Sequence, residues 1–377
     1  MPNELNRKFF LQRLLKEKNP VEFIKKQIAD GKISEEDLLE IICANHNLLN
    51  HQIVRQCVED DLLQAEQLME RGINQRFLEM LYEEPEDVLP TVGNIKGIDY
   101  ETTEVYFWGI PTSGKTCALG TIFKAARSGK VLECLGVETC QGLRYYQILK
   151  QIFDSPDGYC ILPGRTPLDT NFAIRTEMTD HDHKHHPVTL IDMAGELFCA
   201  IAWEENGDEN LLTDKHREAI ADFKNILINN CSTNPKYHFF IIEYNRESRR
   251  YKDYDQDTYL DAGLRYLINN GVLNKPEDRV FVIVTKTDLL EQDIDPNQDK
   301  KQYLLDFLNE RYPNFFSLIN NHCRERKING GVLPPPIVFS VGDVRFQLLC
   351  HINTDSANHV IEQIISPPKK KGGWFSF

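Results

Sequence analysis

The stretch GIPTSGKT, at residues 109–116, decides the fold of this 377-residue chain. It fits the pattern GxxxxGK[ST], follows the apolar run VYFWG and opens a helical pattern over residues 114–127. Glycines let a backbone wrap closely around an anion, and the N–H groups at a helix start point toward negative charge. The sequence therefore predicts a strand, a phosphate-binding loop and a helix in direct succession.

Apolar runs alternate with helical patterns from Ile98 onward. Runs such as VFVIV suit strands that are buried on both faces of a parallel sheet. Only HDHKHHP separates the second run from the third, which predicts an antiparallel hairpin. We expect an α/β fold with a doubly wound, mostly parallel six-stranded sheet that contains one antiparallel strand. The expected strands are 104–109, 172–179, 188–192, 237–244, 279–285 and 336–341, and the expected helices are 114–127, 142–153, 214–229, 258–269, 302–320 and 356–365.

Residues 1 to about 85 place apolar side chains at helical spacing, with a helix N-cap pattern at Ser34. A stretch rich in proline, glycine and acidic residues follows at 83–97 and is typical of a linker. We therefore expect an all-helical N-terminal domain at 1–90 that binds other proteins, a nucleotide-binding α/β domain at 98–366, and a basic and aromatic tail at 367–377.

The net charge of -14, without a long basic stripe to offset it, argues against nucleic acid as a partner. The N-terminus does not have the pattern of a signal peptide, and the apolar runs are too short to span a bilayer. We expect a cytoplasmic protein. The tail joins lysines 369–371 to Trp374 and Phe377, a combination that can dock weakly on the inner membrane surface or on a partner protein.

Two motifs predict the chemistry at the phosphates. Lys115 is expected to reach the β- and γ-phosphates of a nucleotide, and the Thr116 hydroxyl to bind Mg²⁺. The sequence DMAGE, at 192–196, follows the apolar run VTLI. Asp192 at this strand end can hold Mg²⁺, and Gly195 can offer its N–H to the γ-phosphate.

Two later motifs predict the base. In TKTD, at 285–288, the Asp288 carboxylate can accept hydrogen bonds from guanine N1–H and the exocyclic amine, while the Lys286 stem lies along the purine. In FSVGD, at 339–343, backbone N–H groups can contact guanine O6. The predicted nucleotide contacts are Gly109, Pro111, Thr112, Ser113, Gly114, Lys115, Thr116, Cys117, Thr285, Lys286, Asp288, Ser340 and Val341.

The ordered set GIPTSGKT, DMAGE, TKTD and FSVG resembles the Ras- and Arf-like small-GTPase branch of the P-loop (TRAFAC) GTPases. YQILKQIF, LPGRTP and the appended helical region are also similar to bacterial double-GTPase proteins. The resemblance implies a GTP/GDP switch that uses Mg²⁺ held by Thr116, Asp192 and a switch threonine. It also implies catalytic roles for Lys115, Gly195, the switch threonine and the residue at Glu196.

Several residues depart from the family pattern. A long insertion precedes Asp192, so the switch threonine is either Thr166 or Thr170, and we favour Thr166. Thr285 stands where an asparagine is commoner. Glu196 follows the DxxG motif at a position where many relatives have a water-orienting glutamine.

We therefore expect a GTP-binding switch with slow GTP hydrolysis, coupled to a helical module that binds an effector or regulator. The alternative is a GTP-binding scaffold without significant hydrolysis, because an ionised Glu196 can only accept hydrogen bonds. A helical interaction protein with a vestigial α/β domain is a third hypothesis, and the intact Lys115, Thr116 and Asp288 argue against it.

Overall fold

The chain divides into two units in the computed structural model. The α/β unit comprises residues 87–154, 164–341 and 353–377, and the mixed unit comprises residues 1–86, 155–163 and 342–352. No helix in the described part of the chain is long and apolar enough to cross a membrane. The predicted tail at 367–377 lies outside the described residues. These residues are 4–83, 98–130, 132–133, 140–164, 166–168, 171–180, 182–228, 232–244, 250–252, 254–295 and 297–365.

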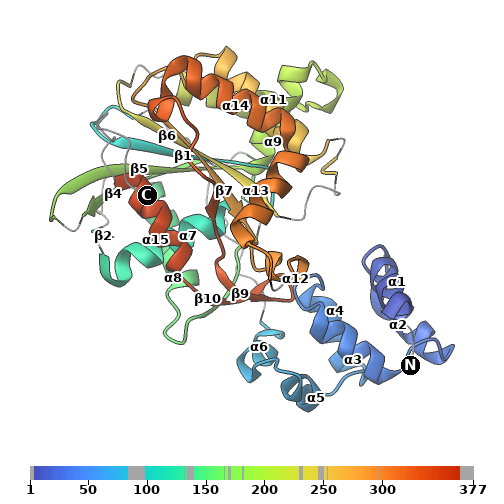
Figure 1. Cartoon of the computed structure of the whole chain (residues 1–377). Helices are drawn as coiled ribbons and strands as arrows, with labels where there is room; N and C mark the ends of the chain where they lie inside the picture. Colours follow the sequence, from blue (N-terminus) through green and yellow to red (C-terminus); the bar gives the residue numbers. More distant parts are fainter. Residues whose placement is uncertain are drawn as a thin grey trace. The chain divides into compact units, whose positions relative to one another are not determined.

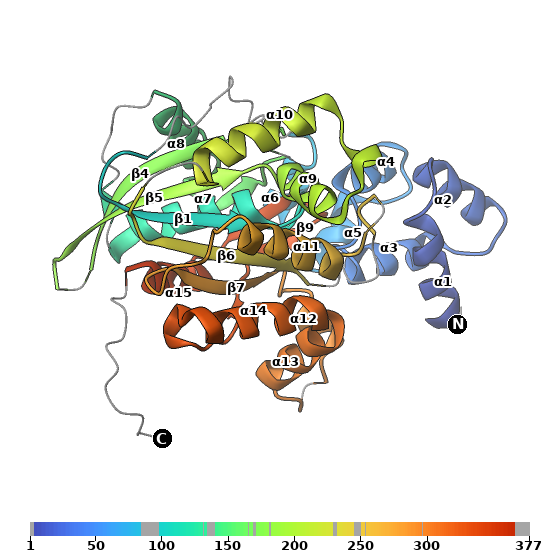
Figure 2. The same ribbon diagram turned by 90° about the horizontal axis from the view of Figure 1, so that it is seen from above.

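The α/β unit is built on a seven-stranded sheet in the order β2-β4-β5-β1-β6-β7-β8, of which β4, β5, β1, β6 and β7 lie side by side in Figure 2. The strand β4 runs antiparallel to both neighbours, and β5, β1, β6, β7 and β8 are mutually parallel. All six predicted strands and the predicted hairpin are confirmed, and the two-residue β2 adds a seventh strand. The bounds are β1 Thr103–Trp108, β2 Leu132–Glu133, β4 Asn171–Thr179, β5 His185–Met193, β6 Lys236–Glu243, β7 Arg279–Thr285 and β8 Ile337–Val338.

Helices cover both faces of this sheet (Figure 1), as expected for a doubly wound fold. One face carries α7 (Lys115–Ala125), α8 (Cys140–Phe153) and α15 (Asp355–Ile365); the other carries α9 (Gly195–Asn206), α10 (Asp214–Phe223), α11 (Gln256–Asn269) and α14 (Pro313–Arg326). The short α12 (Leu290–Asp293) and α13 (Lys300–Arg311) precede α14.

Two helix predictions need correction. The single helix expected over 302–320 is split, because Pro313 begins α14 and a proline is tolerated only in the first turn of a helix. The helix α9 was not predicted, and it begins at Gly195 of the DMAGE motif. Its residues from Leu197 to Trp203 are all buried, so the apolar run LFCAIAW has no amphipathic period to mark it as a helix.

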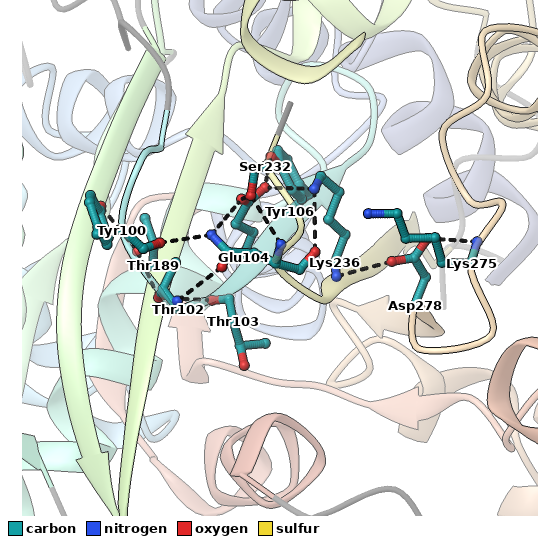
Figure 3. Close-up of polar contacts among 11 residues, drawn as sticks. Tyr100, Thr102, Thr103, Glu104, Tyr106, Thr189, Ser232, Lys236, Lys275 and Asp278 are labelled. Carbon is teal, nitrogen blue, oxygen red and sulfur yellow. Dashed lines mark hydrogen bonds and ion pairs between the residues drawn. The ribbon is translucent and has the colours of Figure 1, made fainter. Parts of the chain in front are cut away.

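The amino ends of β1 and β6 are closed by a buried polar network (Figure 3). The Glu104 carboxylate is fully buried and accepts hydrogen bonds from Tyr106 (2.7 Å) and Ser232 (2.6 Å). The ammonium group of Lys236 lies 3.4 Å from the same carboxylate. The Asp278 carboxylate accepts from the Lys236 backbone N–H at 3.1 Å. These groups satisfy one another, as buried polar groups generally must.

The described residues of the mixed unit form six helices and a small sheet. The antiparallel sheet has the order β3-β10-β9. The bounds are α1 Glu4–Leu14, α2 Pro20–Ala29, α3 Glu35–Ala44, α4 His51–Glu59, α5 Ala65–Glu70, α6 Gln75–Met80, β3 Tyr159–Ile161, β9 Gly342–Arg345 and β10 Leu349–Ile352.

The all-helical N-terminal domain is therefore corrected to a mixed unit, and the predicted range 98–366 includes two segments that belong to it. Phe346 and Leu349 are fully buried in the core formed by the N-terminal helices. The Phe77 and Tyr159 rings meet edge to face with centroids 5.3 Å apart. Such long-range packing leaves no periodic pattern within residues 1–90, so the local pattern indicated helices alone.

Candidate functional site

The loop 109–116 follows the end of β1, and its last two residues lie in the first turn of α7, as the predicted order of strand, loop and helix requires. Its conformation requires glycine at two positions. Gly114 has a φ of 91°, in the left-handed region that favours glycine. A Cβ atom at Gly109 would lie 2.8 Å from Ser113 Oγ and 3.0 Å from the Ile241 carbonyl oxygen. The loop is thus tightly folded against the end of β6.

Lys115 is buried at the first position of α7. Its ammonium group donates hydrogen bonds to the carbonyl oxygens of Gly109 (2.8 Å) and Ile110 (2.9 Å). The positive charge therefore lies inside the loop, beside the helix N-terminus, where both the charge and the helix dipole favour an anion.

Gly195 brings the end of the DMAGE motif against the same loop. A Cβ atom at this position would lie 2.5 Å from the Pro111 nitrogen and 2.7 Å from the Lys115 ammonium nitrogen. Only glycine permits this approach. The DMAGE motif and the loop 109–116 are therefore in direct backbone contact.

The three side chains that are predicted to hold Mg²⁺ meet beside the start of α7. The Thr116 hydroxyl lies 3.0 Å from the Thr166 hydroxyl and donates a hydrogen bond to Asp192 Oδ2 at 3.3 Å. Burial raises the pKa of Asp192, while its hydrogen bond from Tyr145 and the positive charge of Lys115 act in the opposite direction. Hard oxygen atoms of this kind are the ligands that Mg²⁺ prefers. The rival switch residue Thr170 lies outside the described residues.

Two buried side-chain oxygen atoms in the described part of the α/β unit have no hydrogen-bond partner: Ser113 Oγ and Asp192 Oδ1. Both belong to the motifs at the carboxyl edge of the sheet, whereas the Glu104 carboxylate at the amino edge is satisfied. Leaving a buried polar atom unpaired costs about 1–3 kcal/mol. A bound group that uses both oxygens would remove this cost.

No cluster of three His, Cys, Asp or Glu side chains that could hold a metal occurs among the described residues. A divalent cation at Asp192 would therefore depend on the hydroxyls of Thr116 and Thr166, together with phosphate and water oxygens. Mg²⁺ ordinarily binds in this way, through one or two protein groups and substrate phosphates.

The TKTD motif connects the loop 109–116 to the segment that follows β8. The Thr285 hydroxyl donates to the Ser113 carbonyl at 2.7 Å, and the Thr287 hydroxyl donates to the Phe339 carbonyl at 3.1 Å. Lys286 has a φ of 58°, and its ammonium donates to Glu243 at 2.6 Å. Asp288 follows as a half-buried residue. The motifs predicted to bind the phosphates and the base are thus joined by hydroxyl-to-backbone hydrogen bonds.

The remaining predicted contacts lie in the same elements. Thr112 has a φ of 61° within the loop, and Cys117 lies in the first turn of α7. After β8, the Ser340 backbone N–H donates to Ser356 Oγ at 3.2 Å. The Val341 carbonyl accepts a hydrogen bond from the Asn353 N–H at 2.9 Å.

Glu196 makes two polar contacts with basic side chains. Its Oε1 atom accepts a hydrogen bond from Lys252 at 3.1 Å and lies 3.4 Å from His216 Nε2. Partial burial would raise the pKa of Glu196, but the contacts with Lys252 and His216 outweigh it and lower the pKa. The Lys252 ammonium also lies 4.4 Å from the centre of the Trp203 ring. The Glu196 carboxylate is therefore ionised and held by these neighbours.

Tyr145 is a site residue that the sequence analysis missed. It projects from α8, is fully buried, and its hydroxyl donates to Asp192 Oδ2 at 2.5 Å. Burial, together with the Asp192 charge, raises the pKa of Tyr145 well above its usual value, so the phenol is a neutral donor. The helix 142–153 was expected, but helical spacing does not say which of Tyr145 and Tyr146 faces a strand end.

No known protein-family model matches this chain, and no curated protein matches it. The chain is similar to the structure of Methanosarcina barkeri Roco2 RocCORdC bound to GDP, with 10% sequence identity and a TM-score of 0.28. The alignment covers 75% of this chain and 55% of that one, so it spans about half of the similar chain. A likeness at this score carries no weight for function.

Proposed function

We propose that this protein binds GTP and GDP with Mg²⁺ at the carboxyl edge of its sheet and hydrolyses GTP slowly. One observation carries the proposal. Beside a loop whose conformation requires glycine lie the side chains of Lys115, Thr116, Thr166 and Asp192, and the TKTD motif is hydrogen-bonded to that loop. In open α/β sheets, ligands bind outside the carboxyl ends of the strands. The site has this location.

The residues present fit a triphosphate with a magnesium ion. The loop N–H groups and Lys115 supply donors and positive charge to the phosphates. The hydroxyls of Thr116 and Thr166, and the unpaired Oδ1 of Asp192, supply oxygens to the cation. When bound there, Mg²⁺ would neutralise charge on the reacting phosphate. Thr166 would contact it only while the γ-phosphate is present, which is how such segments become ordered.

We propose that Asp288 selects guanine over adenine. A carboxylate can only accept hydrogen bonds, and guanine presents two adjacent donors at N1 and the exocyclic amine. Adenine lacks the N1–H donor. Lys286, anchored at its end by Glu243, offers its aliphatic stem to the face of the purine.

We propose that hydrolysis is slow because the Glu196 carboxylate is ionised and is held by its neighbours. Water orientation in this reaction uses a group that can both donate and accept, such as a glutamine amide. An ionised carboxylate held by Lys252 and His216 has neither the donor nor the freedom to serve. We expect an unaided rate on the order of 10⁻⁴ to 10⁻³ per second or below. The same observation favours the second candidate function, a GTP-binding scaffold without significant hydrolysis.

We infer that the mixed unit is the part that binds another protein. Its large apolar side chains Phe9, Met69 and Tyr82 are exposed, and exposed aromatic residues are common at protein interfaces. The proposed partner is an effector or regulator. We further propose a cytoplasmic location and weak docking of the tail on the inner membrane surface.

Calorimetry of the full chain with GDP, ADP and Mg²⁺, repeated with Lys115→Ala, tests binding. We expect Mg²⁺-dependent GDP binding that ADP does not match and that Lys115→Ala largely removes. Equal affinity for ADP would contradict the guanine assignment.

Single-turnover GTP hydrolysis by the wild type, Glu196→Gln and Thr166→Ala then separates the switch from the scaffold. Fast turnover that Glu196→Gln abolishes would show Glu196 to be a direct catalyst, against this proposal. An unaffected Thr166→Ala would transfer the switch role to Thr170.

A further inference from the structure

Helix α8 is an inserted element that lies against the proposed metal site, and two contacts fix it to α7. Phe153 of α8 occupies the space that a side chain at Gly120 would fill, since a Cβ there would lie 2.3 Å from the Phe153 ring. The Lys124 ammonium donates to the Phe153 carbonyl at 2.8 Å. The position of α8 relative to the phosphate-binding loop is thus set by direct packing on the helix that follows the loop.

Tyr145 extends from α8 to the end of β5. Its ring stacks on Phe172 with centroids 4.0 Å apart and planes inclined by 17°. Phe172 lies opposite Asp192 in the β4–β5 pairing, so a phenol stacked on Phe172 brings its hydroxyl to the Asp192 carboxylate. The resulting hydrogen bond to Oδ2 is 2.5 Å long. Ring packing therefore fixes the direction of the donor.

The two carboxylate oxygens of Asp192 differ in their hydrogen bonding. Oδ2 accepts from Tyr145 and, at 3.3 Å, from Thr116. Oδ1 is buried and has no partner among the described residues. A carboxylate held through one oxygen cannot rotate freely, so the other oxygen has a fixed direction. Outer groups that orient metal-binding carboxylates in this way commonly change metal affinity when they are removed.

We propose that Tyr145 is a positioning residue for the metal site: it holds Asp192 through Oδ2 and leaves Oδ1 to face Mg²⁺ or a water molecule bound to it. The inference rests on the proposed function, and it adds that the inserted helix α8 sets the metal affinity. In this proposal Tyr145 acts through the Asp192 carboxylate and not by direct contact with the cation or the nucleotide. Its contribution is to keep the carboxylate in one orientation.

The test is the release of a fluorescent GDP analogue from the full-length protein as a function of Mg²⁺ concentration. Tyr145→Phe removes the hydroxyl and keeps the ring on Phe172. We expect about a tenfold rise in the Mg²⁺ concentration that half-maximally slows release, within the range of about 10–100-fold found for such partners. Release in excess EDTA should stay at the wild-type rate, because the nucleotide contacts are unchanged.

Tyr146→Phe is the matched control, since Tyr146 is the adjacent buried tyrosine of α8 and its hydroxyl accepts from Arg127 at 3.1 Å rather than binding Asp192. It should leave the Mg²⁺ dependence unchanged. In an Asp192→Ala background, Tyr145→Phe should not change the Mg²⁺ dependence further, because the carboxylate that Tyr145 positions is gone. Only molecules that retain the fluorescent nucleotide contribute signal, so a partly unfolded variant does not distort the result.

A wild-type Mg²⁺ dependence in Tyr145→Phe would overturn the inference and leave the proposed function intact. An equal effect of Tyr146→Phe would overturn it too, because the change would then reflect α8 packing in general. If the wild type releases nucleotide at the same rate with and without Mg²⁺, or does not bind guanine nucleotides, the proposed function fails and the inference with it.

Discussion

Thr285 provides the sharpest test of how the site is held together. Its hydroxyl is buried and donates at 2.7 Å to the carbonyl of Ser113, in the middle of the phosphate-binding loop. Thr285→Val keeps the shape of the side chain and removes this donor. Losing one partner of a buried hydrogen bond costs about 1–3 kcal/mol. If the loop loses its fixed conformation, GDP binding must restore that conformation, and the free energy this costs weakens the affinity for GDP.

Each 1.4 kcal/mol corresponds to a tenfold change in affinity, so the range above corresponds to about 5- to 150-fold weaker GDP binding. We expect about tenfold. Thr176→Val is the matched control, because the Thr176 hydroxyl is equally buried and donates to the Val188 carbonyl at 3.0 Å, within the β4–β5 hairpin. It should lower the free energy of unfolding without changing GDP affinity. Calorimetry and thermal unfolding measure the two quantities. Wild-type GDP affinity in Thr285→Val, or equal weakening in Thr176→Val, would refute the reasoning.

Three further outcomes follow from the packing and the charges. Gly195→Ala places a methyl group 2.7 Å from the Lys115 ammonium nitrogen. This overpacking costs about 1–3 kcal/mol, so we expect the chain to stay folded and its GDP affinity to fall by at least tenfold. Unchanged GDP affinity by calorimetry would count against the contact. Lys252→Met should lower the melting temperature at pH 7. Because the pKa of Glu196 is lowered from 4.5, the ion-pair stabilisation is present above pH 4.5 and is lost as the pH falls through the folded-state pKa, so the difference between the two melting temperatures should shrink in acid to the part contributed by the Lys252–Trp203 contact. A difference as large in acid as at pH 7 would show that the ion pair contributes nothing. Deleting residues 1–92 should expose the buried turn between β9 and β10, so we expect the fragment to aggregate in size-exclusion chromatography. A monomeric fragment with wild-type GDP affinity would show that the sheet β3-β10-β9 does not need helices α1 to α6.

The local part of the fold was predictable because most strands of the α/β unit contain a short apolar run and most of its helices have a regular apolar period. The loop glycines also have a local signature, since Gly109 and Gly114 stand at fixed offsets from Lys115. Parallel strands then bring the ends of β1, β5, β7 and β8 to one edge, so the motifs that follow these strands meet there.

The parts that were missed depend on long-range contacts. Phe346 belongs to the core of the N-terminal helices although some 300 residues of sequence lie between them, as the 2.5 Å bond from its N–H to the His46 carbonyl shows. Helix α9 is buried all round and therefore has no amphipathic period. The Tyr145 contact depends on how α8 packs on α7 and β4, and the partners of Glu196 come from α10 and from the segment before α11. Local sequence patterns do not encode such contacts.

The central claim is a guanine-nucleotide site at the carboxyl edge of the sheet, and the base preference of Asp288→Asn tests it most directly. A carboxylate accepts from the two donors of guanine, whereas an asparagine amide can donate to the carbonyl that xanthine presents in place of the amine. Calorimetry of the wild type and Asp288→Asn with GDP and XDP in Mg²⁺ gives four affinities. We predict that the wild type prefers GDP and that the variant prefers XDP. Unchanged GDP preference in Asp288→Asn would contradict the account, since the base would then be recognised elsewhere.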